Sequence, residues 1–420
     1  MRVPAEPVVV VGAGLGALRT AESLRSHGYD GPVLVLGDEP WLPYSRPPLT
    51  KEALVGDVDH AALAFRLRPE VADVQWHLGE PVVAADPEAR TVTTRAGDVV
   101  AYAALVAASG VRPRRLEDVG IAVPHGTART VVRTLEDAAA LAPLLREHRR
   151  LAVVGAGFIG CEVAAAARSR GCQVDVVAVD DEPMVRPLGP LLAAALRRRH
   201  EAAGVRFHLG RTIAAVVPAG EDGASRLELD DGTTLEADVV VEALGSDPRP
   251  TWLTDPRLDV ADGVHVDAAL RPWLSGDVGA HALDGVAVVG DLARFPNPRF
   301  GAGAWRVEHW STPTDTGRRA GAVLARWLAS GCDAQDADYR AVVEQPWEVL
   351  PTFWSDQADV HLLSYGMPQL ADPDGIGALE GDLDGDVVVG YHRGDALVGV
   401  VGVGALRATH TYRDAIGMGR

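Results

Sequence analysis

Two glycine-rich turns, each following an apolar run, have the spacing of a dinucleotide-binding site. Residues 8–11 (VVVV) lead into residues 12–17 (GAGLGA), and residues 151–154 (LAVV) lead into residues 155–160 (GAGFIG). In such a turn the first glycine permits the tight bend, the second lets the backbone approach a pyrophosphate, and the third small residue lets helix and strand pack closely. The phosphates then lie at the positive end of the helix dipole. The motifs predict two dinucleotide sites; the alternative is that one unit has lost its ligand and kept only a structural role.

A single lysine is the second feature that could carry chemistry. Of the 40 basic residues, Lys51 is the one lysine and the other 39 are arginines. A GC-rich genome explains such a bias, because it replaces lysine by arginine wherever either cation serves. Lys51 is then a position where arginine does not serve, and hence a functional candidate. The alternative is a surface lysine that has survived by chance.

The elements around these residues repeat along the chain. Each glycine motif is followed by a helical pattern and a second apolar strand, at residues 33–36 and 174–179, which makes two βαβ units. Paired alternating strands follow in both halves, at 90–108 and 226–243, and residues 286–291 (VAVVGD) form a buried strand that ends on an acid. Beyond about residue 330 tryptophans recur, and residues 387–403 predict two strands of a separate C-terminal domain.

Composition excludes several classes of protein. The chain has 420 residues, 47% hydrophobic and 23% charged, as expected for a globular protein of two or three domains. A net charge of −18 argues against a nucleic-acid partner, and no apolar run is long enough to span a membrane. The three cysteines, Cys161, Cys172 and Cys332, have no metal-binding spacing, so we expect no metal site and a reducing, cytoplasmic environment. The N-terminus runs directly into a strand, which leaves no room for a signal peptide.

Five short segments together carry a family resemblance. Residues 42–51 (LPYSRPPLTK) are similar to a P-Y-x-R-P-P-L-S-K segment, and residues 133–138, 290–291, 306–310 and 353–357 (FWSDQ) follow in the same order. In this respect the chain resembles the FAD-dependent, nicotinamide-oxidising ferredoxin reductases of oxygenase and cytochrome P450 systems, the putidaredoxin reductase-like group. The resemblance covers essentially the whole chain. It implies an α/β fold of the glutathione reductase-like type, with two Rossmann-like domains and a smaller α+β C-terminal domain.

The domain boundaries follow from that resemblance. Residues 4–112 and 245–325 are expected to form the two parts of an FAD-binding domain. Residues 113–244 are expected to form an NAD(H)-binding domain, and residues 326–420 a C-terminal reductase domain.

The resemblance also implies the site residues. For FAD these are Gly12, Gly14, Leu15, Gly16, Ala17, Asp38, Glu39, Arg46, Lys51, Val82, Ala108, Arg133, Asp291, Glu308, His309 and Trp310. For NAD they are Gly155, Gly157, Phe158, Ile159, Gly160, Glu162, Asp180, Arg186 and Gly245. The catalytic candidates are Lys51, Glu162 and Pro48, with the lysine and the glutamate forming an ion pair beside flavin N5.

Residue-level reasoning supports part of this set. Asp38 and Glu39 end the second strand, where an acid accepts hydrogen bonds from the adenosine ribose. Thr312 is expected to be the N-cap of a helix that follows Trp310, with Pro313 at its first position and Asp315 completing a capping box. His309 has an equally simple interpretation as a packed histidine.

The expected reaction passes electrons to an external carrier. Disulfide-reducing relatives of this fold need a cysteine beside the flavin, and residues 1–160 contain none. A hydride therefore enters from NADH, and single electrons leave to an iron–sulfur ferredoxin that feeds a P450 or a ring-hydroxylating oxygenase. Rubredoxin or a quinone is an alternative acceptor, and a redox-signalling flavoprotein of the apoptosis-inducing-factor type is an alternative of another class.

Two further expectations concern selectivity. NADH is preferred over NADPH because the acids of residues 180–182 would repel a 2′-phosphate, although Ala178 stands where relatives carry an acid. An acidic enzyme needs local positive charge to dock a ferredoxin. The arginines expected to supply it are Arg294, Arg299, Arg318 and Arg319.

Overall fold

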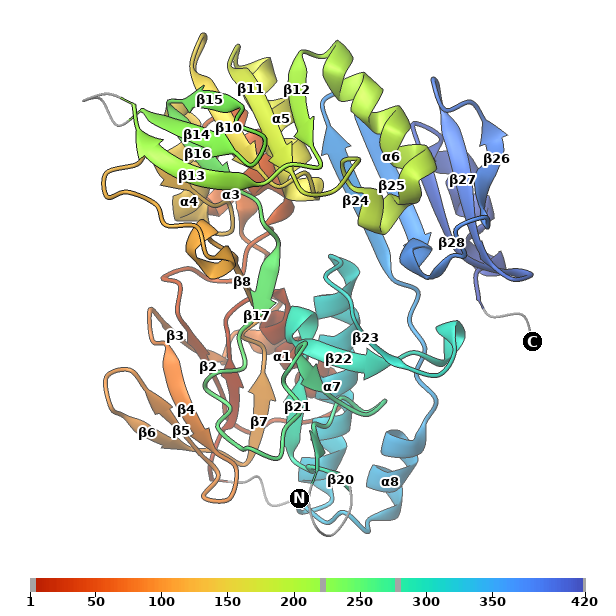
Figure 1. The fold of residues 1–420 in the computed structure, drawn as a ribbon. Coiled ribbons are helices and arrows are strands. Elements are labelled where there is room, and N and C mark those ends of the chain that lie inside the picture. Colours follow the sequence, from red (N-terminus) through yellow and green to blue (C-terminus); the bar gives the residue numbers. More distant parts are fainter. Residues whose placement is uncertain (1–4, 220–223, 276–280, 418–420) are drawn as a thin grey trace. The chain divides into compact units, whose positions relative to one another are not determined.

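The computed structural model describes residues 5–219, 224–275 and 281–417 (Figure 1). The chain divides into two compact units. Unit 1 comprises Met1–Ser45, Ala64–Arg112 and Asp247–Pro351, and unit 2 comprises Arg46–Leu63, Pro113–Ser246 and Thr352–Arg420. Residue 4 and residues 418–420, the outer limits of the expected domains, lie outside the described residues. The finer division into four segments stays a prediction.

Unit 1 is built on a five-stranded parallel sheet with the order β21–β7–β1–β2–β3. The strands are β21 (Val286–Val288), β7 (Ala104–Ala107), β1 (Val8–Val11), β2 (Val33–Gly37) and β3 (Gln75–Leu78). In the centre, Val8 lies opposite Val33 on one side and Ala104 on the other. All four residues of β1 are buried, which is why this strand is an uninterrupted run of valines. The first predicted βαβ unit is confirmed.

Helix α1 (Leu15–Ser26) packs directly against helix α7 (Ser311–Ala329) in unit 1 (Figure 1). Two glycines of α7 make this close approach possible. A Cβ on Gly317 would lie 2.7 Å from the carbonyl oxygen of Gly16, and one on Gly321 would lie 2.5 Å from Cβ of Ser23. Because Gly317 and Gly321 have no side chain, α7 can pack directly against α1 and the first glycine motif.

The start of α7 differs from the sequence-based expectation. The N-cap residue is Trp310, so Thr312 and Pro313 both lie inside the first turn, and the prediction of a Thr312 cap with Pro313 at the first position was wrong. Proline is tolerated throughout the first turn because those N–H groups have no intrahelical partner. The presence of Pro313 therefore limits the first residue of α7 to a few positions but does not identify which of them it is.

Smaller elements complete unit 1. They are β4 (Val82–Asp86), β5 (Thr91–Thr94), β6 (Val99–Ala101), β18 (Val264–His265), β19 (Trp273–Leu274), β20 (His281–Ala282), β22 (Ala293–Pro296), β23 (Ala304–Arg306), α8 (Ala337–Glu344), η2 (Pro69–Val71), η5 (Gly290–Leu292) and η6 (Pro298–Phe300). The strands β8 (Val111–Pro113) and β17 (Ser246–Pro248) carry the chain from one unit to the other.

Unit 2 repeats the parallel arrangement with the order β12–β11–β10–β16–β9. These strands are β12 (Val205–Leu209), β11 (Gln173–Ala178), β10 (Arg150–Val154), β16 (Val239–Glu242) and β9 (Arg129–Thr130). Helix α5 (Phe158–Ser169) follows the second glycine motif, and α6 (Val185–Ala202) connects β11 to β12. The second βαβ unit is confirmed as well.

An antiparallel five-stranded sheet forms the C-terminal part of unit 2, with the order β24–β25–β28–β27–β26. Its strands are β24 (Thr352–Gln357), β25 (Val360–Gly366), β28 (Ala396–Val403), β27 (Val387–Arg393) and β26 (Ile376–Gly381). The two strands expected between residues 387 and 403 are therefore present.

Helix α6 is anchored to this C-terminal part. The Tyr391 hydroxyl donates to the Leu188 carbonyl at 2.7 Å, and Arg198 forms an ion pair with Asp384. Ala193 and Leu196 are completely buried. One face of this alanine- and arginine-rich helix is therefore buried.

The remaining elements of unit 2 are short. They are η1 (Pro47–Thr50), α2 (Glu52–Val55), α3 (His60–Leu63), η3 (Leu116–Val119), α4 (Leu135–Leu141), η4 (Ala142–Leu144), β13 (Ile213–Pro218), β14 (Ser225–Leu229), β15 (Thr234–Ala237), η7 (Pro368–Leu370), α9 (Leu406–Thr411) and η8 (Arg413–Ala415).

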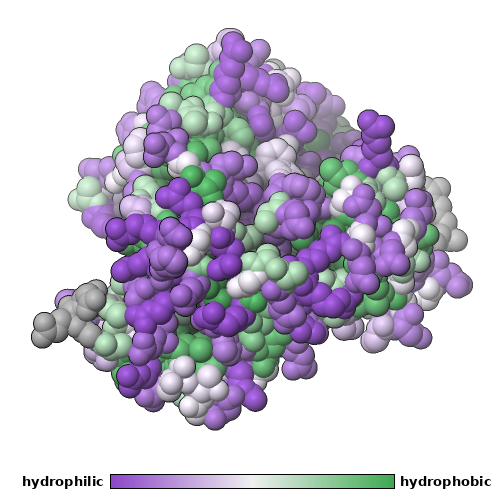
Figure 2. Space-filling view, turned by 90° about the horizontal axis from the view of Figure 1, so that it is seen from above, coloured by the Kyte–Doolittle hydropathy of each residue, from purple (hydrophilic) through white to green (hydrophobic). Residues whose placement is uncertain are grey.

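Hydrophilic side chains predominate on the face shown in Figure 2, with hydrophobic residues dispersed among them. This fits a chain with 58 acidic and 40 basic residues. Across the residues that the structure describes, none of the helices has the length and apolarity needed to cross a bilayer.

Candidate functional site

The first glycine motif contains two glycines that are required for different reasons. Gly12 has φ +107°, and a Cβ there would lie 2.2 Å from the carbonyl oxygen of Ala108, so the turn itself excludes any other residue. Gly14 has φ −86° and extended backbone, which any residue adopts. No described protein atom beyond its chain neighbours lies within 4 Å of where its Cβ would be. Neither the backbone nor the packing demands glycine at position 14, and the space beside its backbone is open to a ligand.

The second motif repeats this arrangement. Gly155 has φ +109°, and its Cβ would lie 2.1 Å from the Ala243 carbonyl oxygen. Gly160 is equally constrained, since its Cβ would lie 2.1 Å from the Gly155 carbonyl oxygen. Gly157 has φ −76°, and in the described structure no atom beyond its chain neighbours lies within 4 Å of its Cβ position. Both motifs thus leave open space in front of a helix N-terminus, which fits a pyrophosphate.

The neighbouring motif residues form the first turns of the two helices. In unit 1 Leu15, Gly16 and Ala17 open α1, and a Cβ on Gly16 would lie 3.2 Å from Cγ2 of Val289. In unit 2 the ring of Phe158 packs at 4.9 Å from the ring of Phe353, and Ile159 is 44% exposed. Phe158 therefore contributes to packing in addition to any contact with a nucleotide.

Asp38 and Glu39 follow β2, where the sequence predicts contacts with the adenosine ribose. Asp38 Oδ2 accepts a hydrogen bond from Arg249 Nη1 at 2.6 Å, and the side chains of this ion pair are about two-fifths exposed. Glu39 Oε2 accepts from the Tyr44 hydroxyl at 2.6 Å. Sequence reasoning missed Arg249, because it lies 211 residues from its partner.

Asp291 lies in η5, directly after β21. The backbone N–H of Gly290 donates to Thr316 Oγ1 at 2.9 Å, and the Thr316 hydroxyl donates to the Thr312 carbonyl at 2.5 Å. Thr316 is completely buried and ties this turn to α7. These two hydrogen bonds therefore fix the turn that carries Asp291 to helix α7.

The segment before α7 holds the last candidates in unit 1. Glu308 pairs with Arg306, Trp310 is 39% exposed, and the partly buried His309 has its pKa lowered to about 4 by removal from water. His309 is therefore neutral at pH 7. Val82 is the first residue of β4, also in unit 1.

Three FAD candidates, Arg46, Lys51 and Arg133, belong to unit 2, as does the catalytic candidate Pro48. The guanidinium of Arg46 donates to the carbonyl of Arg133 at 2.7 Å, so these two are brought together. The carbonyl of Pro48 accepts the backbone N–H of Lys51 at 3.1 Å, which closes the short helix η1. Pro48 thereby sets the direction in which the Lys51 backbone leaves η1.

Lys51 and Glu162 form the predicted ion pair, with Nζ at 2.8 Å from Oε2. Only 14% of the lysine side chain and 8% of the glutamate side chain are exposed. The lysine ammonium also donates to the carbonyl of Pro47 at 3.2 Å, and the hydroxyl of Thr50 donates to Glu162 Oε2. The one lysine of the chain is thus a buried, fully engaged charge and not a surface residue.

Sequence reasoning missed three polar residues next to this pair, of which Thr50 and Ser355 contact Glu162 and Gln357 contacts Ser355. Thr50 lies within the quoted 42–51 segment, and Ser355 and Gln357 lie within the quoted 353–357 segment. Ser355 Oγ donates to Glu162 Oε1 at 2.5 Å, and Gln357 Nε2 donates to Ser355 Oγ at 3.0 Å. The sequence did contain a signal for Ser355 and Gln357. Both share the buried face of β24 with Phe353, and a polar side chain on a buried face needs hydrogen-bond partners.

The loop after β11 holds the acids expected to select the nicotinamide nucleotide. Asp180 pairs with Arg186 at 3.1 Å, and Glu182 pairs with Arg197 at 2.8 Å. Two of the three carboxylates are thus partly neutralised within the protein. Gly245, the last NAD candidate, has φ +87°, and its carbonyl accepts the backbone N–H of Arg114 at 2.9 Å.

The four arginines proposed for docking have different environments. Arg319 is 7% exposed and donates to the carbonyls of Ala268, Val342 and Gln345, so its assignment to a docking surface was wrong. Its guanidinium connects α7 to the chain around α8. Arg294 pairs with Asp259 and Arg299 with Glu348, whereas Arg318 is exposed.

Cys161 and Cys172 are completely buried. Burial raises the pKa of both thiols, which keeps them protonated and unreactive. In the described part of the chain, no three His, Cys, Asp or Glu side chains gather in a way that could hold a metal ion.

Comparison with known proteins adds a family match over most of the chain. The model of the pyridine nucleotide-disulphide oxidoreductase family matches residues 6–315. The ferredoxin–NAD(+) reductase component of the anthranilate 1,2-dioxygenase system of Burkholderia cepacia is 36% identical over 371 residues, which cover 86% of this chain and 82% of that protein. Rhodocoxin reductase of Rhodococcus erythropolis is 33% identical over 367 residues, which cover 87% and 79%. Among solved structures, a chain of the covalent putidaredoxin reductase–putidaredoxin complex matches with a TM-score of 0.85 and 27% identity, covering 98% of this chain and 92% of that chain.

Proposed function

Because the chain belongs to the pyridine nucleotide-disulphide oxidoreductase family, we propose that it is an NADH-dependent, FAD-containing reductase of an iron–sulfur ferredoxin. The observation that carries this proposal is the open space beside the backbone of Gly14 and Gly157, one at the N-terminus of each motif helix, which leaves room for a ligand at the backbone. Two such positions, one in each unit, support one dinucleotide on each glycine motif. The name of the Burkholderia cepacia relative, the ferredoxin–NAD(+) reductase component of a dioxygenase system, supports ferredoxin as the acceptor.

FAD would be held by the first motif and NADH by the second. As FAD contacts in unit 1 we propose Asp38, Asp291 and Trp310, and the assignment of Arg46, Lys51 and Arg133 of unit 2 to FAD stays a prediction from the family resemblance. Around NADH we place the α5 N-terminus, Glu162, Gly245 and the loop of residues 180–186. Bound FAD supplies the chemistry of accepting a hydride from the nicotinamide and releasing single electrons.

The protein's own contribution is a fixed charge. Lys51 offers a compact ammonium, and Glu162 holds it through an ion pair that is almost closed to water. Such a pair adds little stability, since desolvation cancels much of the attraction. Its use is electrostatic, because a preorganised positive charge stabilises an electron-rich ring without any reorganisation during the reaction. Arginine would keep the charge but is larger and planar, which explains the one lysine.

The acceptor is proposed to be external and to carry one electron at a time. The first cysteine of the chain, Cys161, is buried with a raised pKa and is unsuited to form the reactive thiolate that attacks a disulfide or a peroxide. We place the enzyme in an electron chain that ends at a P450 or a ring-hydroxylating oxygenase. We also propose a cytoplasmic location, which fits three free cysteines.

Purified protein should be yellow and should reduce cytochrome c with NADH when a [2Fe-2S] ferredoxin is added. Without ferredoxin the rate should be much lower. Lys51→Arg and Lys51→Met should both keep FAD bound but slow its reduction by NADH in stopped-flow experiments, and Glu162→Gln should do the same. Rapid turnover with a disulfide and none with ferredoxin would refute the proposed acceptor. Reduction of Lys51→Arg at the wild-type rate would refute the role of the lysine.

A further inference from the structure

A line of buried polar side chains runs from Glu162 through the C-terminal sheet to α6. Ser355 Oγ lies 2.5 Å from Glu162 Oε1, Gln357 Nε2 lies 3.0 Å from Ser355 Oγ, and His200 Nε2 lies 2.6 Å from Gln357 Oε1. The four residues are only 7%, 1%, 1% and 4% exposed, respectively. Together with Lys51 they form a continuous chain of five side chains, which we call the Glu162 relay.

The direction of each hydrogen bond follows from the carboxylate at one end. A carboxylate only accepts, so the single hydroxyl proton of Ser355 is donated to Glu162. Ser355 Oγ must then accept from the amide nitrogen of Gln357, which leaves the amide oxygen to accept from His200. Burial lowers the pKa of His200, so at neutral pH the ring is neutral and its one proton is on Nε2. Every donor in the relay therefore points towards Glu162.

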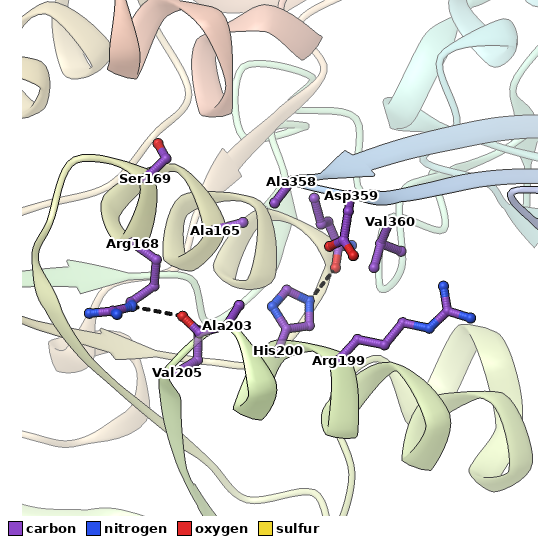
Figure 3. A pocket seen from close by; sticks show the side chains of 11 residues that line it. Ala165, Arg168, Ser169, Arg199, His200, Ala203, Val205, Ala358, Asp359 and Val360 are labelled. Atoms are coloured by element: carbon purple, nitrogen blue, oxygen red, sulfur yellow. Dashed lines mark hydrogen bonds between the residues drawn. The ribbon is translucent and has the colours of Figure 1, made fainter. Parts of the chain in front are cut away.

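Both the amide oxygen and the amide nitrogen of Gln357 have hydrogen-bond partners. Its second amide hydrogen is directed to Met184 Sδ, at 3.2 Å from Nε2, and Met184 is the residue that caps α6. His200 and Gln357 also line a cavity of about 230 Å³ between α5, α6 and the turn after β24 (Figure 3). Figure 3 shows the His200 ring among the side chains that line this cavity. The relay thus ends at the cavity wall with Gln357 and His200.

We infer that Ser355 and Gln357 are positioning residues that hold the Glu162 carboxylate in the orientation that fixes the Lys51 ammonium. The inference rests on the proposed function of the Lys51–Glu162 pair. Glu162 Oε2 accepts from Lys51 and from Thr50, whereas Ser355 is the donor to Oε1. Ser355 and Gln357, on the inward face of β24, therefore set the position of the Lys51 ammonium through Glu162.

The cost of losing Ser355 follows from the burial of Glu162. Without the hydroxyl, Oε1 is a buried charged oxygen that has lost its donor, and such an atom is expensive to leave unpaired. The carboxylate would rotate to regain a partner and would carry Oε2 away from Lys51. A charge-assisted hydrogen bond of this kind corresponds to about a tenfold effect on flavin reduction, or about 1.4 kcal/mol. Gln357→Met, which keeps the length of the side chain and removes its amide, should act in the same direction.

The chain offers a matched control. Ser364 on β25 lies opposite Phe353 of β24 and is 0% exposed, and its hydroxyl has no hydrogen-bond partner within the described ranges. Ser364→Ala removes the same atom from the same sheet at the same depth. It should change neither the Lys51 environment nor flavin reduction.

The first experiment uses the one lysine of the protein as a probe. In FAD-loaded protein labelled with ¹³C-lysine, the ε-methylene of Lys51 gives a single NMR signal. Ser355→Ala and Gln357→Met should move this signal in the direction seen for Glu162→Gln, and Ser364→Ala should leave it in place. An unmoved signal in Ser355→Ala, with a large movement in Glu162→Gln, would overturn the inference.

The second experiment is a double-mutant cycle on flavin reduction by NADH. Ser355→Ala should slow reduction about tenfold in wild-type protein and less than twofold in the Glu162→Gln background, since its effect requires the carboxylate. An equal slowing in both backgrounds, or none in either, would overturn the inference. If Glu162→Gln itself reduces at the wild-type rate, the proposed function of the pair fails, and the NMR comparison still decides whether Ser355 positions Glu162.

Discussion

Replacing Gly14 with alanine separates what the fold requires of the first motif from what a ligand requires. The backbone at Gly14 is extended, and the Cβ would enter open space among the described residues. Alanine is a poorer N-cap than glycine, but it also reduces the entropy of the unfolded chain by about 0.4–1 kcal/mol. These effects oppose each other, so the free energy of unfolding of the FAD-free protein should change by no more than about 1 kcal/mol.

The same methyl group should weaken FAD binding. Forcing one extra carbon into a well-packed contact costs about 1–3 kcal/mol, which corresponds to a dissociation constant about 5 to 150 times higher. FAD affinity is measured by fluorescence titration of the FAD-free protein, and stability by chemical denaturation of the same sample. A wild-type dissociation constant in Gly14→Ala would refute the reasoning that a pyrophosphate contacts this backbone.

Two further glycine variants complete the test. Gly12→Ala should fail through folding, because its Cβ would lie 2.2 Å from the Ala108 carbonyl oxygen at φ +107°. Strain and overpacking together should cost about 2–6 kcal/mol. Gly157→Ala should keep FAD affinity and stability and should weaken NADH binding alone. If Gly157→Ala releases FAD instead, the assignment of the two nucleotides to the two motifs is reversed.

Three other predictions follow from the charges of the site. Arg186→Gln should release the carboxylate of Asp180 and so raise the ratio of kcat/KM for NADH to that for NADPH. The increase should be at most about fivefold, because the exposed ion pair contributes at most about 1 kcal/mol. An unchanged ratio would place Asp180 away from the 2′-position. His309 has a folded pKa of about 4 against about 6.5 in the unfolded chain, so between these values only the unfolded state is protonated and stability falls as pH falls. His309→Gln should therefore lose about 2 kcal/mol less than wild type between pH 7 and pH 5 in thermal unfolding of FAD-saturated protein, and parallel losses would contradict this. Arg318→Glu should raise the KM for ferredoxin and weaken the salt dependence of that KM. Arg340→Glu, which makes the same change of charge on α8, should do neither. Identical kinetics in the two variants would remove α7 from the docking surface.

The sequence alone determined the parallel sheets and the turns that join their strands to helices. Buried strands appear as uninterrupted apolar runs, and the steric demands on Gly12 and Gly155 arise within the local turn and the adjoining strand. A resemblance carried by short segments also predicted the Lys51–Glu162 pair, whose members lie far apart in the chain. The start of α7 could not be fixed in this way, because several residues of a first turn are compatible with proline.

Only the tertiary structure decided which polar groups meet. Ser355 lies 193 residues from Glu162, His200 lies 157 residues from Gln357, and Thr50 lies 112 residues from Glu162. Likewise, Arg318 and Arg319 are adjacent in sequence, yet one is exposed and the other is buried, because neighbouring positions on a helix point about 100° apart. Periodicity and backbone sterics are local and can be predicted from neighbouring residues, whereas the partner of a buried polar atom is set by segments that only the folded chain brings together.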